Sequence, residues 1–161
     1  MKLPYGVELI PLISHKDLRG FFREIFKKSW LNIFGSEVKQ VSHTFMKKNV
    51  IKAWHYHRLQ TDWWYVVSGQ INAFLMDFRQ QEFSKPMKIT LTSNKPHLLK
   101  IPPMIIHGLR VLSEECHLIY FTDQEYNPLD EGRIPYNDPR IPFKWNGPIV
   151  VGEGDLKTNL I

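Results

Sequence analysis

The stretch that decides the fold is NVIKAWHYHRLQTDWWYVVSG, residues 49–69. It is rich in β-branched and aromatic residues, which favour strands over helices. Because alternate side chains of a strand share a face, His55 and His57 are expected to point the same way. Asp62 begins the next apolar run. Two imidazoles on one face predict either a pair of metal ligands or a base with a binding partner.

Short runs of this kind follow one another through most of the chain, separated by turn signals. Ser68-Gly69-Gln70 resembles a tight hairpin turn. The row Trp63-Trp64-Tyr65 predicts a strand buried on both faces or, alternatively, one Trp at the rim of a cavity. Many short strands at this spacing predict a β-sandwich, barrel or jelly roll. The predicted strands are VKQVSHTFM (38–46), NVIKAWHYH (49–57), DWWYVVSG (62–69), INAFLMDF (71–78), KITLTS (88–93), HLLKIPP (97–103), IHGLRVLS (106–113) and CHLIYFT (116–122).

One segment has a helical pattern. In KKSWLNIFG (27–35), Trp30, Leu31 and Phe34 are at helical spacing and Gly35 is a stop signal. No repeat, low-complexity segment or linker divides the chain, so a single domain over residues 1–161 is expected.

The composition limits the classes of function. Of the 161 residues, 43% are hydrophobic and 23% charged, as in globular proteins. No apolar run approaches the roughly 20 residues that span a bilayer, and the N-terminal stretch lacks a signal-peptide pattern, so a cytoplasmic protein without a membrane partner is expected. The single Cys116 excludes an internal disulfide and a multi-Cys zinc site. The net charge of +5 fits a small anionic ligand, whereas the scattered basic residues argue against nucleic acid.

The spacing of the histidines resembles a known pattern. His55-x-His57 is followed by Asp62 and Gly69, and Pro102 precedes His107 downstream. This arrangement resembles the two motifs of the cupin superfamily, with Asp62 where Glu is usual. Cupins are small β-barrels of jelly-roll type whose motif residues often hold a divalent metal.

A second resemblance covers nearly the whole chain. Seven segments in order resemble the dTDP-4-dehydrorhamnose 3,5-epimerase family, a metal-independent branch of the cupin fold. The segments are DLRGFFRE (17–24), VKQVSHT (38–44), IKAWHYH (51–57), MDFR (76–79), HGLRVLS (107–113), IYFTDQEYNP (119–128) and YNDPRIPFKW (136–145). The resemblance implies an all-β, cupin-type jelly-roll β-barrel with one or two short helices, no cofactor, and a homodimer with strand exchange.

The resemblance also implies the roles of individual residues. His55 falls on the general base, Asp155 on the carboxylate that pairs with that base, and Tyr120 on the general acid. The residues that fall at the nucleotide-sugar site are Arg19, Glu24, Gln40, Lys52, His57, His107 and Glu131.

The implied function is epimerisation at C3, C5 or both of a nucleotide-linked 4-keto-6-deoxy sugar. Such sugars are made for surface polysaccharides or glycosylated products. The C4 ketone makes the hydrogens at C3 and C5 acidic, and a base on one face with an acid on the other inverts the centre. A neutral imidazole suits the base, because its reference pKa is roughly 6.5.

Three departures from the family keep alternatives open. Lys52 stands where the family has Arg, and His57 where it has Gln. The family's enolate-stabilising Lys is missing, because that region reads Thr61-Asp62-Trp63. One alternative is a metal-dependent cupin, either an isomerase or a dioxygenase, with His55, His57, Asp62 and His107 as ligands. This alternative and the epimerase compete for His55. A third interpretation, besides the epimerase and the metal-dependent cupin, is a non-catalytic sugar-binding cupin.

Overall fold

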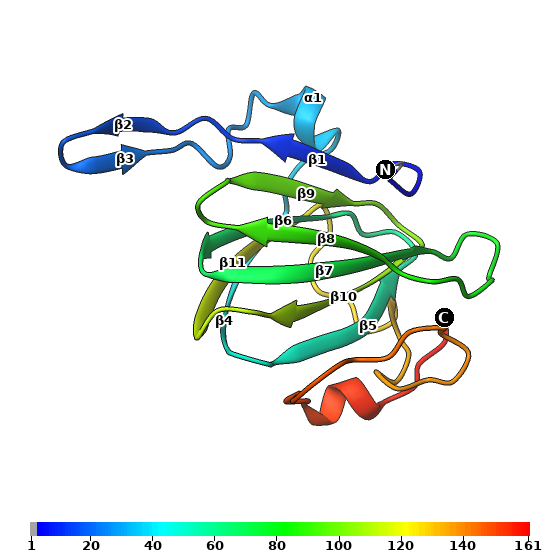
Figure 1. The fold of residues 1–161 in the computed structure, drawn as a ribbon. Coiled ribbons are helices and arrows are strands. Elements are labelled where there is room, and N and C mark those ends of the chain that lie inside the picture. The colour runs from blue at the N-terminus through cyan, green and yellow to red at the C-terminus, as the bar shows by residue number, and fades with distance from the viewer. Residues whose placement is uncertain (1–2) are drawn as a thin grey trace.

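The computed structural model describes residues 3–161, apart from the side chains at positions 31 and 32. Two antiparallel five-stranded sheets face each other, and a two-stranded arm projects from one end (Figure 1). The first sheet has the order β1 (Glu8–Pro11), β9 (His97–Ile101), β6 (Asp62–Ser68), β11 (Glu115–Thr122) and β4 (Gln40–Lys47). The second has the order β12 (Glu131–Arg133), β5 (Ile51–His57), β10 (Ile105–Val111), β7 (Gln70–Asp77) and β8 (Met87–Thr92). The arm consists of β2 (His15–Asp17) and β3 (Gly20–Phe22).

From β4 onward, successive strands alternate between the two sheets except at β7 and β8, which both belong to the second sheet. Of these strands, only β7 and β8 are both consecutive and paired with each other. All eight strands that the sequence predicted are present, and their alternation confirms the predicted jelly roll.

The predicted hairpin turn at Ser68-Gly69-Gln70 is wrong. β6 and β7 belong to opposite sheets, so this turn carries the chain across the end of the sandwich. Gly69 has a φ of +87°, and a Cβ at this position would collide with the carbonyl oxygen of Glu115. The crossover therefore requires glycine.

The row of aromatic residues on β6 packs against both faces of the first sheet. Trp64 points between the sheets, where it joins the central apolar core. Trp63 and Tyr65 point outward and pack with Phe34 of the short helix α1 (Leu31–Phe34). Each fully buried side chain of this size contributes roughly 1.5–3 kcal/mol. The Leu31 side chain, which the sequence placed in the helical pattern, lies outside the described residues.

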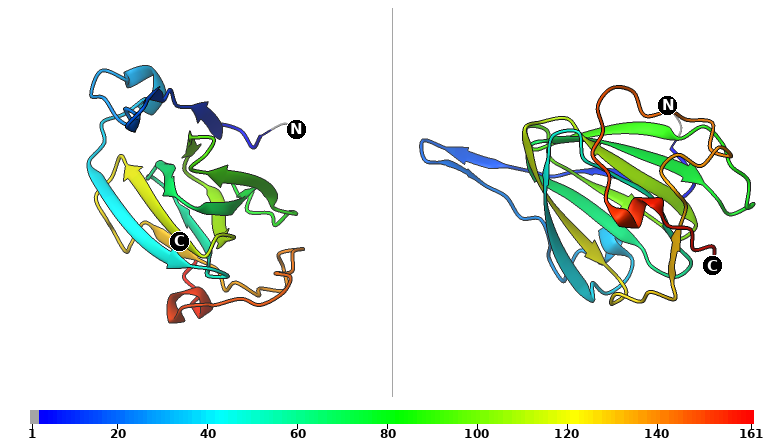
Figure 2. Two further views of the ribbon diagram at one scale, coloured as in Figure 1. Left: turned by 60° about the vertical axis from the view of Figure 1, so that its left-hand side comes forward. Right: turned by 90° about the horizontal axis from the view of Figure 1, so that it is seen from below.

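The C-terminal segment, residues 134–161, covers the outer face of the second sheet (Figure 2). It contains the 3₁₀ helix η1 (Glu153–Leu156). Trp54 of β5 packs against Phe143 and Trp145 of this segment, with ring centroids 5.8 and 5.2 Å apart. The segment therefore holds β5 from outside, which matters because β5 carries the predicted site.

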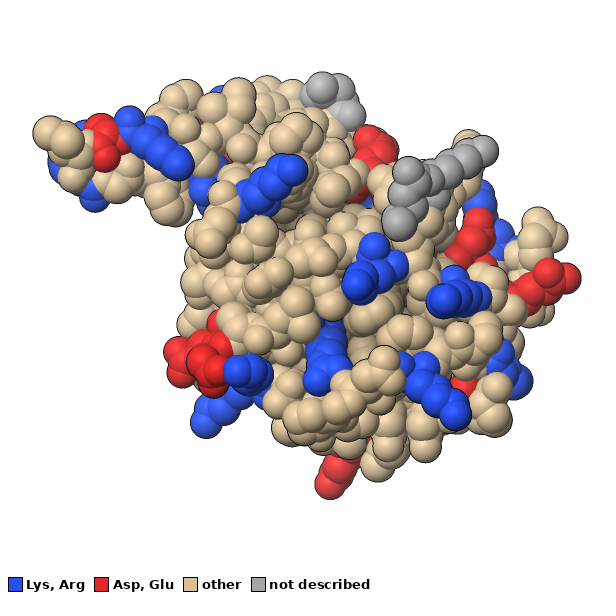
Figure 3. All heavy atoms as spheres, in the orientation of Figure 1, with Lys and Arg blue, Asp and Glu red and all other residues tan. Residues whose placement is uncertain are grey.

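Lys and Arg side chains are spread over the face shown in Figure 3, interspersed with Asp and Glu. Among the described residues, no helix has both the length and the apolar character that crossing a bilayer requires.

Gly132 tests the packing that holds β12 against β5. A Cβ at this position would overlap the buried ring of Tyr56, whose hydroxyl is hydrogen-bonded to the backbone of Ile161. We expect Gly132→Ala to lower the free energy of unfolding by about 1–3 kcal/mol, because overpacking displaces well-packed neighbours. Urea denaturation measures the loss.

The matched control is Gly152→Ala, since a Cβ there meets only Asp155 Oδ2 at 3.4 Å. Equal stability of the two variants would show that β12 is not held tightly by Tyr56.

Candidate active site

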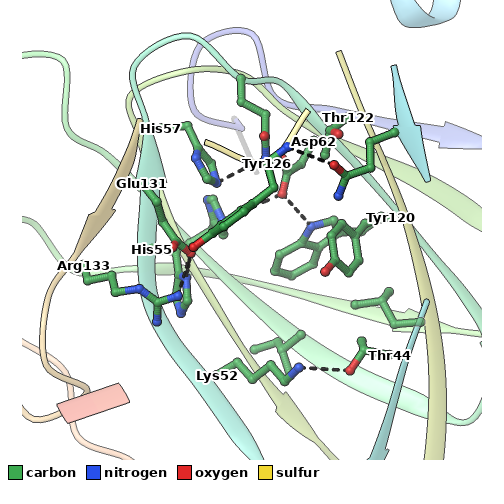
Figure 4. Close-up of a pocket in the computed structure, with 16 residues that line it drawn as sticks. Thr44, Lys52, His55, His57, Asp62, Tyr120, Thr122, Tyr126, Glu131 and Arg133 are labelled. Carbon is green, nitrogen blue, oxygen red and sulfur yellow. Dashed lines mark hydrogen bonds and ion pairs between the residues drawn. The ribbon is translucent and has the colours of Figure 1, made fainter. Parts of the chain in front are cut away.

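A cavity of about 400 Å³ opens between the two sheets. Its volume lies in the range of about 300–1,000 Å³ that small-molecule sites occupy. Polar side chains from both sheets point into it (Figure 4). The lining residues are Gln40, Thr44, Lys52, His55, His57, Gln60, Asp62, Trp64, His107, Leu109, Leu118, Tyr120, Thr122, Tyr126, Glu131 and Arg133.

A β-bulge in β5 brings three of these residues to one face. His107 of β10 is paired with His55, but Leu109 is paired with Lys52, so two residues of β5 lie opposite Gly108 alone. An extra residue reverses the alternation of side chains along a strand. His55 and His57 share the cavity face, as the strand period predicted, and the bulge adds Lys52 to them.

The partner of His55 is Glu131. His55 Nδ1 lies 3.1 Å from Glu131 Oε1, and Arg133 donates to the same oxygen at 2.8 Å. Because a carboxylate only accepts, Nδ1 of the neutral ring carries the proton and Nε2 has a free lone pair. Burial raises the pKa of Glu131, but the hydrogen bonds from His55 and Arg133 outweigh burial and lower this pKa to about 2.

The predicted pairing of His55 with Asp155 is not present. The two carboxylate oxygens of buried Asp155 accept hydrogen bonds from the backbone N–H groups of Ala53, at 3.0 Å, and Gly152, at 2.8 Å. η1 thus turns Asp155 toward the backbone of β5 rather than toward the imidazole. Burial lowers the pKa of Lys52, and the charge of Asp155 opposes this effect.

Tyr120 and Gln40 line the cavity from the first sheet, opposite β5. In Figure 4, Tyr120 and His55 lie on opposite sides of the cavity. Gln40 Oε1 accepts a hydrogen bond from the backbone N–H of Tyr126 at 2.9 Å, and its Nε2 donates to Ser42 at 3.0 Å. The sequence placed both residues at the site, and the structure brings both to it.

Arg19 and Glu24 lie outside the cavity. Arg19 is on the arm, where its side chain is 90% exposed and paired with Asp17. Glu24 follows the arm and is paired with Lys27. Neither residue lines the cavity of its own chain.

Three of the four residues of the metal alternative lie close together. The nearest ligand atoms of His57, Asp62 and His107 are all within 4.8 Å of one another. His55 is not in this group, although its ring is stacked with that of His107 at 6.3 Å between centroids. Burial lowers the pKa of His107 to about 4, so its ring is neutral near pH 7.

The sequence did not predict several of the residues that line the cavity. Arg133 alternates with Glu131 along β12, so the strand period carried a signal for it once β12 was known. Gln60 lies in the loop between β5 and β6, and no local pattern marks it. Tyr126 lies in the segment 119–128, whose resemblance to the family implies no role for it.

The family model described as dTDP-4-dehydrorhamnose 3,5-epimerase matches residues 3–161. This chain belongs to that family. The resemblance found in the sequence is thereby confirmed.

Three relatives illustrate the match. The spore coat polysaccharide biosynthesis protein SpsL of Bacillus subtilis is 39% identical over 148 residues, which cover 88% of this chain and 95% of SpsL. The dTDP-4-dehydrorhamnose 3,5-epimerase structure from Sulfolobus tokodaii aligns with a TM-score of 0.82 at 31% identity and covers 98% of this chain and 92% of its own. NovW, a 4-keto-6-deoxy sugar epimerase from Streptomyces spheroides, shares the fold with a TM-score of 0.85 at 20% identity, over 97% of this chain and 83% of its own.

The lowered pKa of Glu131 predicts a pH dependence of stability in this family member. The folded-state pKa of about 2 is below the ordinary 4.5, so the ionised carboxylate stabilises the fold above about pH 4.5. This contribution is lost as the pH falls toward 2. We therefore expect Glu131→Gln to be less stable than the parent at neutral pH, with a difference that shrinks in acid. Urea denaturation at several pH values measures it.

Glu114→Gln is the control, because Glu114 is 82% exposed in its pair with Lys48. Exposed pairs of this kind contribute about 0–1 kcal/mol. A Glu131→Gln difference that stays constant down to about pH 2 would contradict the assigned pairing.

Proposed function

We propose that this protein inverts C3, C5 or both of a nucleotide-linked 4-keto-6-deoxy sugar, with His55 as base and Tyr120 as acid. The observation that supports this most directly is the pair of facing groups. His55 belongs to the second sheet and Tyr120 to the first, and both line one cavity. Inversion of a carbon centre requires proton removal on one face and proton delivery on the other.

The hydrogen bond to Glu131 prepares His55 for proton removal. With Nδ1 donating to the carboxylate, Nε2 of His55 is the atom that accepts the proton from carbon. The negative charge of Glu131 stabilises the imidazolium that forms, and it fixes the orientation of the ring. Glu131, rather than Asp155, therefore takes the role of the positioning carboxylate.

Asp155 supports the site in another way. By accepting from Ala53 N–H, its carboxylate fixes the backbone of β5 at the bulge, two residues before His55. Its role in this proposal is to position the strand that carries the base.

Two cations of the cavity suit the diphosphate of the substrate. Lys52 Nζ donates to Thr44 Oγ1 at 2.9 Å, and Arg133 lies on the rim strand β12. Lys binds phosphate as a point charge, whereas the Arg fork binds two oxygens together. The net charge of +5 favours an anionic ligand as well.

Solvent deuterium exchange tests the proposed chemistry. We expect the protein to incorporate deuterium at C3 or C5 of a thymidine- or guanosine-linked 4-keto-6-deoxyhexose. His55→Ala should slow exchange by about 10²–10⁴-fold, the usual contribution of a positioned base. Tyr120→Phe should still exchange but return the deuteron to the original face, so that the sugar is labelled without inversion. Nuclear magnetic resonance distinguishes the two outcomes.

His97→Asn is the matched control, because His97 bonds the carbonyl of Lys95 outside the cavity. Its exchange rate should equal that of the parent. Absence of exchange with both nucleotides would contradict the epimerase function and favour a sugar-binding role.

We also propose that the protein works as a homodimer in which the arm reaches the partner. β2 and β3 pair only with each other among the described strands, and the arm projects away from the sandwich (Figure 1). Leu18, Phe21 and Phe22 are exposed on it. Apolar surface of this kind is typical of a protein interface. An exchanged arm brings Arg19 to the cavity of the partner. This accounts for the position of Arg19 outside the cavity of its own chain.

A complementation experiment tests this exchange. In a purified heterodimer of a His55→Ala chain and an Arg19→Ala chain, the second chain has an intact His55 and receives an intact Arg19 from the first. Each variant alone should be inactive, and the heterodimer should recover about half of the parent activity because one of two symmetric sites is complete.

The control heterodimer combines His55→Ala with Glu131→Ala, which lie in the same cavity of the same chain. It should remain inactive. Failure of the Arg19 heterodimer to recover activity would show that Arg19 does not act across a dimer.

A further inference from the structure

We propose that the cavity holds one first-row divalent metal ion, bound by His57 Nε2, His107 Nε2 and the carboxylate of Asp62. Two imidazoles and one carboxylate on a shared face are a ligand set that such ions bind, with open positions left for a further ligand. The group comes from three strands, β5, β6 and β10, so the fold rather than a flexible loop sets its geometry.

The distances fit a site that contracts slightly when a cation enters. The three nearest ligand atoms lie within 4.8 Å of one another, and His107 Nε2 is 4.0 Å from Asp62 Oδ2. Bonds of about 2.0–2.2 Å to a central ion require small movements of the side chains. Asp62 and His107 are each only 5% exposed, so both are largely removed from water.

The hydrogen bonds of both histidines leave the metal-binding atoms free. His57 Nδ1 lies 3.1 Å from the carbonyl oxygen of Asp130, and His107 Nδ1 lies 2.9 Å from that of Ile105. A carbonyl only accepts, so each Nδ1 carries its proton and each Nε2 presents a lone pair. Donation of the second ring nitrogen to a carbonyl is the usual support of a metal-binding histidine.

Asp130 builds a second layer around this group. Its carboxylate accepts hydrogen bonds from the backbone N–H groups of Arg58, Leu59 and Gln60, at 3.0–3.3 Å. Its carbonyl meanwhile orients His57. One buried residue thus fixes the loop between β5 and β6 and one of the three ligands.

The three side chains have more acceptors than the surrounding donors satisfy. Gln60 Nε2 lies 2.6 Å from Asp62 Oδ1 and 3.3 Å from His57 Nε2, and Trp64 Nε1 donates to Asp62 Oδ2 at 3.2 Å. Among the described residues, His107 Nε2 has no hydrogen-bond partner, although its side chain is only 7% exposed. Because His107 lines the cavity, a cation that enters there meets this unpaired acceptor 4.0 Å from the Asp62 carboxylate. The Gln60 amide is the hydrogen-bond partner of two of these acceptors, Asp62 Oδ1 and His57 Nε2.

The metal site and the base do not compete for one residue. His55 is bound to Glu131 and lies outside the three-residue group. A bound divalent ion supplies Lewis acidity that polarises a carbonyl oxygen, and this role at the C4 ketone rests on the proposed function. The site occupies the region where this chain lacks the Lys that the family resemblance led us to expect.

Direct binding measurements test the site independently of catalysis. The full chain, stripped with a chelator, is titrated with Co²⁺ as a spectroscopic probe and with Zn²⁺ by calorimetry. We expect one ion per chain, with visible Co²⁺ bands that change in variants of the ligands. Asp62→Asn and His107→Gln keep the approximate side-chain size, and each should weaken binding by at least about 10-fold.

Two variants control for surface binding and for misfolding. His43 and His117 form an exposed pair, with Nε2 and Nδ1 2.9 Å apart, so His43→Gln/His117→Gln removes histidines outside the cavity. This double variant should bind as the parent does. Gln60→Ala keeps all three ligands and removes the competing amide, so it should bind at least as tightly as the parent.

Absence of stoichiometric binding, or binding that depends on His43 and His117 rather than on Asp62 and His107, would overturn the metal site. Neither result affects the exchange experiment on His55 and Tyr120. Conversely, metal binding without deuterium exchange would leave the site in place and contradict the epimerase function.

Discussion

The bulge of β5 opposite Gly108 is the constraint on which the cavity depends. A Cβ at Gly108 would lie 2.7 Å from the Cβ of Ala53 and 3.0 Å from the carbonyl oxygen of Lys52, so the two strands approach as closely as they do only with glycine there. The bulge reverses the alternation of side chains, and Lys52 therefore faces the cavity together with His55 and His57. Trp54 meanwhile faces outward into the aromatic cluster of the C-terminal segment.

Three largely buried carboxylates with different partners position the other parts of the site. Asp155 holds the backbone at the bulge, Asp130 holds the loop after His57, and Glu131 holds the imidazole of His55. Each accepts more than one hydrogen bond, which offsets the cost of removing a carboxylate from water. The imidazole of His55, the loop after His57 and the strand β5 are thus each held by a different carboxylate.

Much of the fold could be predicted from the sequence, because β-branched and aromatic runs of strand length are a local signal. The shared face of His55 and His57 followed from the strand period alone. The position of Lys52 on the same face could not be predicted in this way, because a bulge is visible only in the pairing of β5 with β10. The short strand β12 was missed because Glu131-Gly132-Arg133 has no strand pattern of its own. Spacing gave no means to decide which of two distant acids, Glu131 or Asp155, reaches the imidazole, since this depends on how the C-terminal segment folds back.

The alternation of successive strands between the sheets also determines when the site can form. Among the described strands of the first sheet, β4 pairs with β11 alone, with Gln40 opposite Thr122, and His55 is hydrogen-bonded to Glu131. Contacts between residues so far apart in the chain make folding slow and leave strand edges uncovered during synthesis. A nascent chain that ends before β11 leaves β4 without its neighbour, and one that ends before β12 lacks Glu131, the partner of His55. The cavity between the sheets is therefore among the last parts of this protein to be completed as it leaves the ribosome.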